Sequence, residues 1–134
     1  MDKKILKSLY VSPAQTIRVA MSCVDQGGCG IALIVDREDH LMGTITDGDV
    51  RRAVLAGTDL NAPVSMLLEK KVGSSYPKPI TAAPEADRKH LIRLMQQHVL
   101  RQIPIVDGNG RIVDLVMLDD LIPSQDLPLQ AVIM

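Results

Sequence analysis

The chain has 134 residues, a formal net charge of −1 and only 1% aromatic residues. A nearly neutral chain does not supply the basic surface that binds nucleic acid through its phosphates, and so few rings exclude stacking of bases along a single strand. No apolar run in the sequence is long enough to span a membrane. We therefore expect a cytoplasmic protein with neither a nucleic-acid partner nor a membrane partner.

The first half of the chain alternates short β-prone runs with segments of helical periodicity. The predicted elements are, in chain order, a strand at 9–11, a helix marked by Ile17, Ala20, Met21 and Val24, a strand at 31–35, a strand at 41–45 and a helix that follows residues 46–49. A Gly-rich segment at 27–30 ends the first helix, and a turn at 37–40 joins the two longer strands.

The second half repeats this order after a linker. The predicted elements are a short linker helix at 64–69, a strand at 79–82, a helix that begins at Asp87 or its neighbours, a strand at 102–106, a hairpin turn at 107–110, a strand at 111–117 and a helix at 118–122 that Pro123 ends. We assign residues 1–60 to a first repeat, 61–78 to the linker and 79–123 to a second repeat.

An internal repeat supports this division. The segment Ile-Val-Asp at 34–36 recurs at 105–107, 71 positions later. The same offset, held without gaps, pairs Asp49 with Asp120 and matches the apolar pattern of the strands. A repeat that is present twice indicates two small subdomains that pack on each other, because each copy is too short to bury much surface alone.

The segment Thr-Asp-Gly-Asp at 46–49 lies between a predicted strand and a predicted helix. A helix N-terminus presents free N–H groups and a partial positive charge, so it can hold an anion. Asp49 can accept hydrogen bonds from a pair of hydroxyls, and Thr46 can donate one to a phosphate. Either Arg51 or Arg52, one turn later, can also reach a phosphate. This chemistry suits a ribose with a phosphate attached; the alternative is that Thr46 and Asp49 form only a capping box.

The order β-α-β-β-α, present twice, together with Gly43, Thr46 and Asp49 in the pattern Gly-x-x-Thr-x-x-Asp, is similar to a CBS domain pair, or Bateman module. The second copy departs from the pattern, because Asp114 stands at the Gly position and Met117 at the Thr position, and only Asp120 is kept. The resemblance implies an α/β (α+β) fold of two tandem repeats packed with pseudo-two-fold symmetry.

The resemblance also implies a ligand. Such modules bind adenosine nucleotides in the cleft between the two copies, so we expect AMP, ADP or ATP as a regulatory ligand and no obligatory cofactor. The implied nucleotide-binding residues are Thr46, Asp49, Asp120, Thr81, Ile103 and Pro104, with Arg51 as a candidate phosphate contact. The resemblance further implies a homodimer. The sequence contains no nucleophile–base pair and no metal-ligand spacing, so we expect a non-catalytic module.

The segment at 46–53, Thr-Asp-Gly-Asp-Val-Arg-Arg-Ala, resembles the corresponding segment of CBS pairs attached to sugar-phosphate isomerases or sugar-phosphate nucleotidyltransferases. Residues 124–134 predict a polar linker and a hydrophobic strand that resembles the first strand of a truncated nucleotidyltransferase domain. We therefore expect the N-terminal regulatory module of a sugar-phosphate nucleotidyltransferase, joined to its catalytic domain. The alternatives are the CBS pair of a sugar-phosphate isomerase and a ligand-free dimerisation scaffold.

Overall fold

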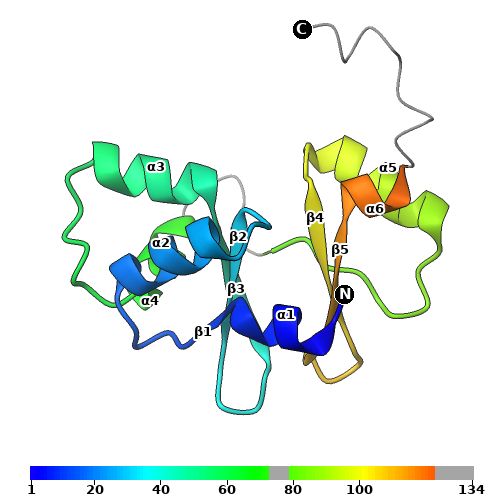
Figure 1. The fold of residues 1–134 in the computed structure, drawn as a ribbon, viewed down its shortest axis with the longest axis horizontal. Coiled ribbons are helices and arrows are strands. Elements are labelled where there is room, and N and C mark those ends of the chain that lie inside the picture. Colours follow the sequence, from blue (N-terminus) through cyan, green and yellow to red (C-terminus); the bar gives the residue numbers. More distant parts are fainter. Residues whose placement is uncertain (73–78, 123–134) are drawn as a thin grey trace, which may run out of the picture.

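The computed structural model describes residues 1–72 and 79–122. The helices are α1 (Lys3–Ser8), α2 (Ile17–Gln26), α3 (Asp47–Leu55), α4 (Ser65–Val72), α5 (Arg88–His98) and α6 (Leu118–Leu121). The strands are β1 (Tyr10–Val11), β2 (Ile31–Val35), β3 (Leu41–Thr46), β4 (Gln102–Val106) and β5 (Ile112–Met117). Strands β1, β2 and β3 form one sheet, β4 and β5 form another, and the two sheets stand side by side between the outer helices (Figure 1).

The strand register reproduces the sequence repeat. In the first hairpin Ile31 of β2 pairs with Thr46 of β3, and in the second Gln102 of β4 pairs with Met117 of β5. Every pair along both antiparallel ladders is related by the same offset of 71 residues, and the irregularity in each ladder falls at equivalent positions. The prediction of two tandem repeats with a shared fold is therefore confirmed.

The two halves differ in their first strand. Strand β1 pairs in parallel with β2, with Val11 opposite Ile34, and its counterpart in the second half is a single parallel bridge between Ala82 and Ile105. The sequence predicts a strand at 79–82, so this strand is reduced to one bridged residue. Pro79 cannot donate a ladder hydrogen bond, which limits pairing at the start of that segment.

Both hairpin turns are organised by an aspartate. The Asp36 carboxylate accepts hydrogen bonds from backbone N–H groups two and four residues later, at 2.8 and 3.0 Å, and Asp107 does the same at the same distances. Chiefly because of the backbone hydrogen bond from His40, the pKa of Asp36 lies below its usual value. The backbone of Arg111 has the same effect on the pKa of Asp107.

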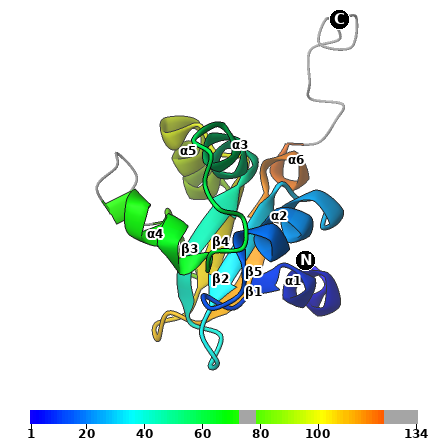
Figure 2. The ribbon, with the colours of Figure 1, turned by 90° about the vertical axis from the view of Figure 1, so that its left-hand side faces the viewer.

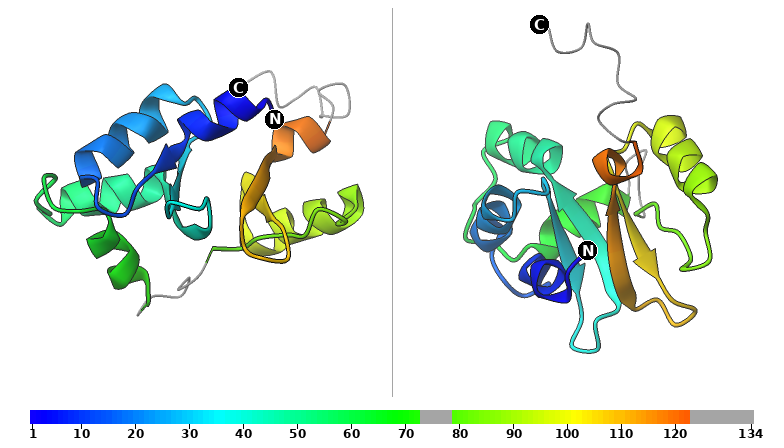
Figure 3. Two further views of the ribbon diagram at one scale, coloured as in Figure 1. Left: turned by 90° about the horizontal axis from the view of Figure 1, so that it is seen from below. Right: turned by 45° about the vertical axis from the view of Figure 1, so that its right-hand side comes forward.

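A reciprocal pair of hydrogen bonds joins the two hairpins. The N–H of Leu41 donates to the carbonyl of Gly110, and the N–H of Ile112 donates to the carbonyl of Asp39, each at 3.0 Å. The two donors, Leu41 and Ile112, are 71 positions apart, and so are the two acceptors, Asp39 and Gly110. The contact therefore has the pseudo-two-fold symmetry that the resemblance implies. Figure 3 shows β3 and β5 as neighbouring strands at this junction.

A shared hydrophobic cluster lies between the halves. Its buried members come from both sheets and from the N-terminal segment: Leu6, Leu9, Ile31, Leu33, Val35, Ile112 and Leu115. Each half also has its own cluster, which forms between its sheet and its helices. The burial of side chains from both halves in one cluster holds the two repeats together without a long connecting element.

Helix α1 is an element that the sequence analysis does not predict. Asp2 caps it by accepting a hydrogen bond from the N–H of Lys4 at 2.8 Å, and Leu6 is only 3% exposed within the shared cluster. Full burial of such a side chain contributes about 2 kcal/mol. A six-residue helix is too short to be stable alone, so its packing between the halves accounts for its formation.

The remaining predictions about the elements have mixed outcomes. The predicted linker helix lies slightly later and extends further, as α4, and α5 begins directly after Asp87, which caps it. Residues 73–78 of the linker and the predicted strand within 124–134 lie outside the described residues. Within 1–72 and 79–122, every helix is too short or too polar to cross a membrane.

Candidate functional site

The turn from β3 into α3 is a complete capping box. The Thr46 hydroxyl accepts a hydrogen bond from the N–H of Asp49 at 3.4 Å. In return, the Asp49 carboxylate accepts from the N–H of Thr46 at 2.9 Å and from its hydroxyl at 3.1 Å. These bonds satisfy free N–H groups at the helix start. The capping box of the alternative interpretation is therefore present, and it fixes the Asp49 carboxylate at the N-terminus of α3.

Two cations also contact the Asp49 carboxylate. Nη2 of Arg52 lies 2.9 Å from Oδ1, and Nζ of Lys71 lies 2.7 Å from Oδ2. The Asp49 side chain is 11% exposed, that of Lys71 24% and that of Arg52 72%. Burial by itself raises the pKa of Asp49, but the hydrogen bonds from Lys71, Thr46 and Arg52 outweigh burial and hold this pKa below its usual value. The carboxylate is therefore ionised near neutral pH.

Lys71 reaches this site from the linker. It lies in the last turn of α4, and its Nζ also donates to the carbonyl of Thr44 in β3 at 2.6 Å. Figure 2 shows α4 beside β3 on the outer side of the first half. The sequence analysis does not identify Lys71 as a site residue, because 22 positions separate it from Asp49 and no local motif links them.

Gly43, the first residue of the motif, leaves room for a side chain of α4. A Cβ at this position would lie 2.5 Å from Cδ2 of Leu68 on α4. The glycine thus allows α4 to pack directly on β3, and this packing brings Lys71 to Asp49. In the second half Asp114 occupies the equivalent position and accepts a hydrogen bond from the N-terminal ammonium group at 3.0 Å.

The other predicted site residues are distributed over both halves. Arg51 is exposed on α3 and forms no ion pair with any described residue. Asp120 is exposed on α6, whose N-cap residue Met117 supplies no side-chain hydrogen bond. The structure therefore brings together Thr46 and Asp49, whereas Arg51 takes no part in the described ion pairs of Asp49 and Asp120 belongs to the other half.

The three predicted base contacts lie close together in the second half. Thr81 is half-buried and precedes Ala82, whose N–H donates to the carbonyl of Pro104 at 3.1 Å. Pro104 is buried, and the Ile103 side chain is fully buried in the cluster between β4 and α5. Ile103 as a whole is 0% exposed, so neither its side chain nor its backbone is open to a ligand in this conformation.

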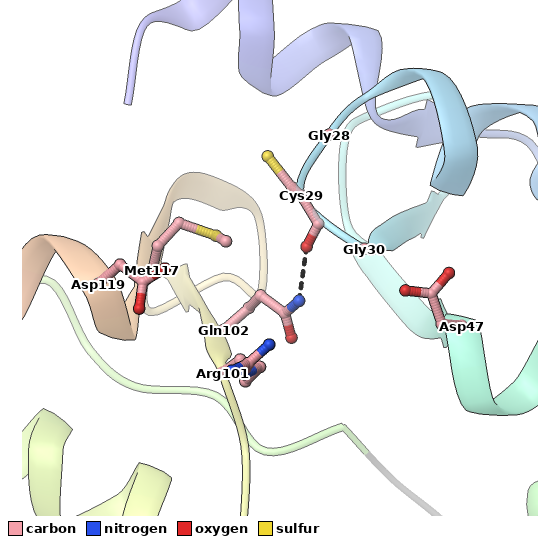
Figure 4. Close-up of a pocket in the computed structure, with 8 residues that line it drawn as sticks. All are labelled: Gly28, Cys29, Gly30, Asp47, Arg101, Gln102, Met117 and Asp119. Atoms are coloured by element: carbon pink, nitrogen blue, oxygen red, sulfur yellow. Dashed lines mark hydrogen bonds between the residues drawn. The ribbon is translucent and has the colours of Figure 1, made fainter. Parts of the chain in front are cut away.

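A small cleft lies between the halves at the start of α3. Its volume is about 260 Å³, and its lining residues are Gly28, Cys29, Gly30, Asp47, Arg101, Gln102, Met117 and Asp119 (Figure 4). Nε2 of Gln102 donates across it to the carbonyl of Cys29 at 2.5 Å. Ligand pockets usually enclose about 300–1,000 Å³, so a nucleotide requires this cleft to widen.

Sequence reasoning misses most of the cleft residues. Asp47 belongs to the 46–49 segment, but Arg101 and Gln102 come from the start of β4 and carry no motif. The one signal in the sequence is the Gly-rich segment 27–30, where Gly28 and Gly30 adopt positive φ angles of 71° and 70°. A second hollow, of about 440 Å³, lies on α5 and contains none of the predicted site residues.

The described part of the chain contains no cluster of metal-binding side chains. Among residues 1–72 and 79–122, no group of three or more His, Cys, Asp or Glu side chains could hold a metal ion. The Asp49 carboxylate, 11% exposed at a helix N-terminus with cations beside it, can form hydrogen bonds with a polar organic ligand.

Comparison with known proteins identifies relatives along most of the chain. The CBS domain family model matches residues 1–56 and 72–125. The CBS domain-containing protein YhcV of Bacillus subtilis is 34% identical over 116 residues, which cover 86% of this chain and 76% of that protein.

Two similar proteins are enzymes. Inosine-5'-monophosphate dehydrogenase of Methanocaldococcus jannaschii is 26% identical over 95% of this chain and 24% of its own length. Arabinose 5-phosphate isomerase GutQ of Salmonella typhi is 27% identical over 80% of this chain and 31% of its own length. This chain therefore spans only about a quarter to a third of each enzyme.

Solved structures share the fold. The CBS domain protein PAE2072 from Pyrobaculum aerophilum, complexed with AMP, has a TM-score of 0.73 at 21% identity, over 93% of this chain and 91% of that chain. The cytosolic domain of the Mg²⁺ channel MgtE, in complex with ATP, has a TM-score of 0.65 at 20% identity, over 84% of this chain and 42% of that chain. At such identities the likeness establishes the fold alone.

Proposed function

We propose that this chain, which belongs to the CBS domain family as a tandem pair of CBS repeats, is a non-catalytic regulatory module that binds an adenosine nucleotide. The observation that carries the proposal is the ionised Asp49 carboxylate at the N-terminus of α3, beside the hydroxyl of Thr46. A carboxylate in this position can accept hydrogen bonds from both hydroxyls of a ribose. The AMP and ATP complexes of the two structural neighbours support the choice of ligand class.

Each predicted site residue has a role in this proposal. Asp49 binds the ribose, and Thr46 and Arg51 face the phosphates. Thr81, Ile103 and Pro104 contact the base once the two halves have moved apart. Asp120, at the position equivalent to Asp49, marks a second and weaker site, because α6 has a single turn and no side-chain cap. The ligand enters between the halves, where the cleft at Gln102 widens to receive it.

Thermal shift is the direct test of the ligand class. A ligand at 100 times its dissociation constant stabilises the folded state by about 2.7 kcal/mol, which corresponds to a rise in Tm on the order of 10 °C for a domain of this size. We expect AMP, ADP or ATP to produce such a rise and a nucleotide without adenine, such as UMP, to produce none. No shift with any adenosine nucleotide would contradict the proposal.

A dimerisation scaffold is the second candidate function, and exposed apolar side chains on α3 favour it. Val54 is 51% exposed and Leu55 is 79% exposed, and such residues commonly mark an interface when they are adjacent. We propose that a second copy of the chain covers them. Leu55→Ser is then expected to yield a monomer in light scattering, whereas Met42→Ser, at a 49% exposed position on β3, leaves the dimer intact. A dimer that survives Leu55→Ser would exclude this interface.

The identity of the enzyme to which this module is attached is the most specific part of the proposal. The nucleotidyltransferase prediction depends on the sequence of residues 124–134, which lie outside the described residues. The similarity to the isomerase GutQ supports the alternative, a CBS pair attached to a sugar-phosphate isomerase. The gene sequence on both sides of this segment tests the two: a glycine-rich nucleotide-binding loop after residue 134 supports the transferase, and an isomerase domain before residue 1 supports the alternative.

A further inference from the structure

The two oxygens of the Asp49 carboxylate are unequally occupied in this conformation. Oδ2 accepts from the N–H and the hydroxyl of Thr46 and from Nζ of Lys71, whereas Oδ1 accepts from Nη2 of Arg52. A carboxylate offers about four lone-pair sites for hydrogen bonds, about two on each oxygen, so Oδ2 is fully occupied. A ribose that donates one hydroxyl to each oxygen of Asp49 must therefore displace a donor from Oδ2.

The donors differ in how readily they can leave. The Thr46 groups belong to the capping box, so their loss would also weaken the start of α3. Arg52 is 72% exposed and can turn into solvent at little cost. Lys71 is only 24% exposed, makes the shortest of the four contacts at 2.7 Å, and is fixed further by the carbonyl of Thr44. Of the three donors on Oδ2, Lys71 is thus the one outside the capping box, and it is firmly held.

We propose that Lys71 is an autoinhibitory gate, which occupies the ribose-binding face of Asp49 and must leave before a nucleoside can bind there. The inference rests on the proposed function and adds a regulatory step to it. Because Lys71 lies in the last turn of α4, its release weakens the contact between α4 and β3. Ligand binding in the first half is in this way coupled to the helix that leads into the second half.

Adenosine is the sharpest probe of the gate, because it has the ribose hydroxyls and no phosphate that Lys71 could attract. Removal of the ammonium group by Lys71→Met should tighten adenosine binding by about tenfold or more, since a charge-assisted hydrogen bond no longer has to be broken. Lys70→Met is the matched control, because Lys70 is the exposed neighbour on the same helix and its loss changes the net charge equally. Calorimetric titration of the three proteins measures the dissociation constants.

The outcomes separate the gate from the proposed function. Equal or weaker adenosine binding by Lys71→Met, in a wild type that binds, would overturn the gate and leave nucleotide binding intact. A loss of AMP binding together with unchanged adenosine binding would assign Lys71 to the phosphate instead. If wild type, Lys71→Met and Lys70→Met all fail to bind adenosine and AMP, the proposed function fails and the gate fails with it.

Hydrogen exchange provides an independent readout of the same step. Adenosine-bound wild type should exchange the backbone amides of residues 65–72 faster than the free protein, because the ligand releases Lys71 from Asp49. Lys71→Met should show fast exchange in α4 without ligand and little further change with it. Slower exchange of α4 in the bound wild type would overturn the gate.

Discussion

Gly43→Ala tests whether the first glycine of the motif serves the packing of α4. The new Cβ would lie 2.5 Å from Cδ2 and 3.1 Å from Cδ1 of Leu68, about 1 Å closer than the ~3.5 Å of ordinary carbon contacts. Leu68 must move, and overpacking of this kind costs about 1–3 kcal/mol. The lower entropy of the unfolded alanine chain offsets about 0.4–1 kcal/mol of that cost. We expect a net loss of about 1–2 kcal/mol.

Urea denaturation of a four-member cycle measures this effect. In a protein that also carries Leu68→Ala, the methyl group at position 43 has room, so Gly43→Ala should cost close to nothing there. The expected coupling energy is about 1–2 kcal/mol, within the range for residues in contact. Gly108→Ala is the control, because no atom lies within 4 Å of its added Cβ. A neutral Gly43→Ala, or costs that add in the double variant, would refute the packing argument.

Further predictions concern the cap, acid stability and the cleft. Thr46→Ala removes half of the capping box and should cost about 1 kcal/mol in urea denaturation, whereas Thr46→Ser should cost less; equal costs would contradict a role for the hydroxyl. Because the pKa of Asp49 is lowered on folding, its stabilising effect is present above the unfolded value of about 3.9 and is lost as pH falls through the folded value. Asp49→Asn should therefore flatten the stability curve in that acid range, and an unaltered curve would contradict the ion pairs. Gly30→Ala places a Cβ 3.2 Å from Oδ2 of Asp47 and 3.3 Å from Nε2 of Gln102, at a φ of +70°. This variant should lower the free energy of unfolding by about 1–2 kcal/mol and weaken nucleotide binding. Wild-type stability would contradict the positive φ at this position.

Much of the fold is predictable from the sequence because its strongest signals are local and occur twice. The strand at 31–35 and the strand at 102–106 have the predicted bounds, since apolar runs between turn residues leave little choice of structure. The repeat adds a long-range constraint, because equal offsets in both ladders imply equal registers. The capping box between Thr46 and Asp49 is also a local signal, which the sequence analysis gives as the alternative to a ligand site and which is present in the structure.

The features that the sequence analysis does not predict depend on tertiary contacts. Helix α1 has no long apolar period and forms because Leu6 packs between the halves. The contact between Lys71 and Asp49 depends on how α4 lies on β3, which is set by the packing of Leu68 against Gly43. Likewise, Arg101 and Gln102 become cleft residues only when the second half is placed against the first.

The most direct test of the central claim is calorimetric titration of an adenosine nucleotide into wild type, Asp49→Asn and Asp120→Asn. Asparagine keeps the shape of the side chain, and Asp120 is the equivalent residue of the other repeat. The proposed site predicts that Asp49→Asn weakens binding by about tenfold or more, the scale of one charge-assisted hydrogen bond, and that Asp120→Asn has a smaller effect. Wild-type affinity in a folded Asp49→Asn variant would contradict the account.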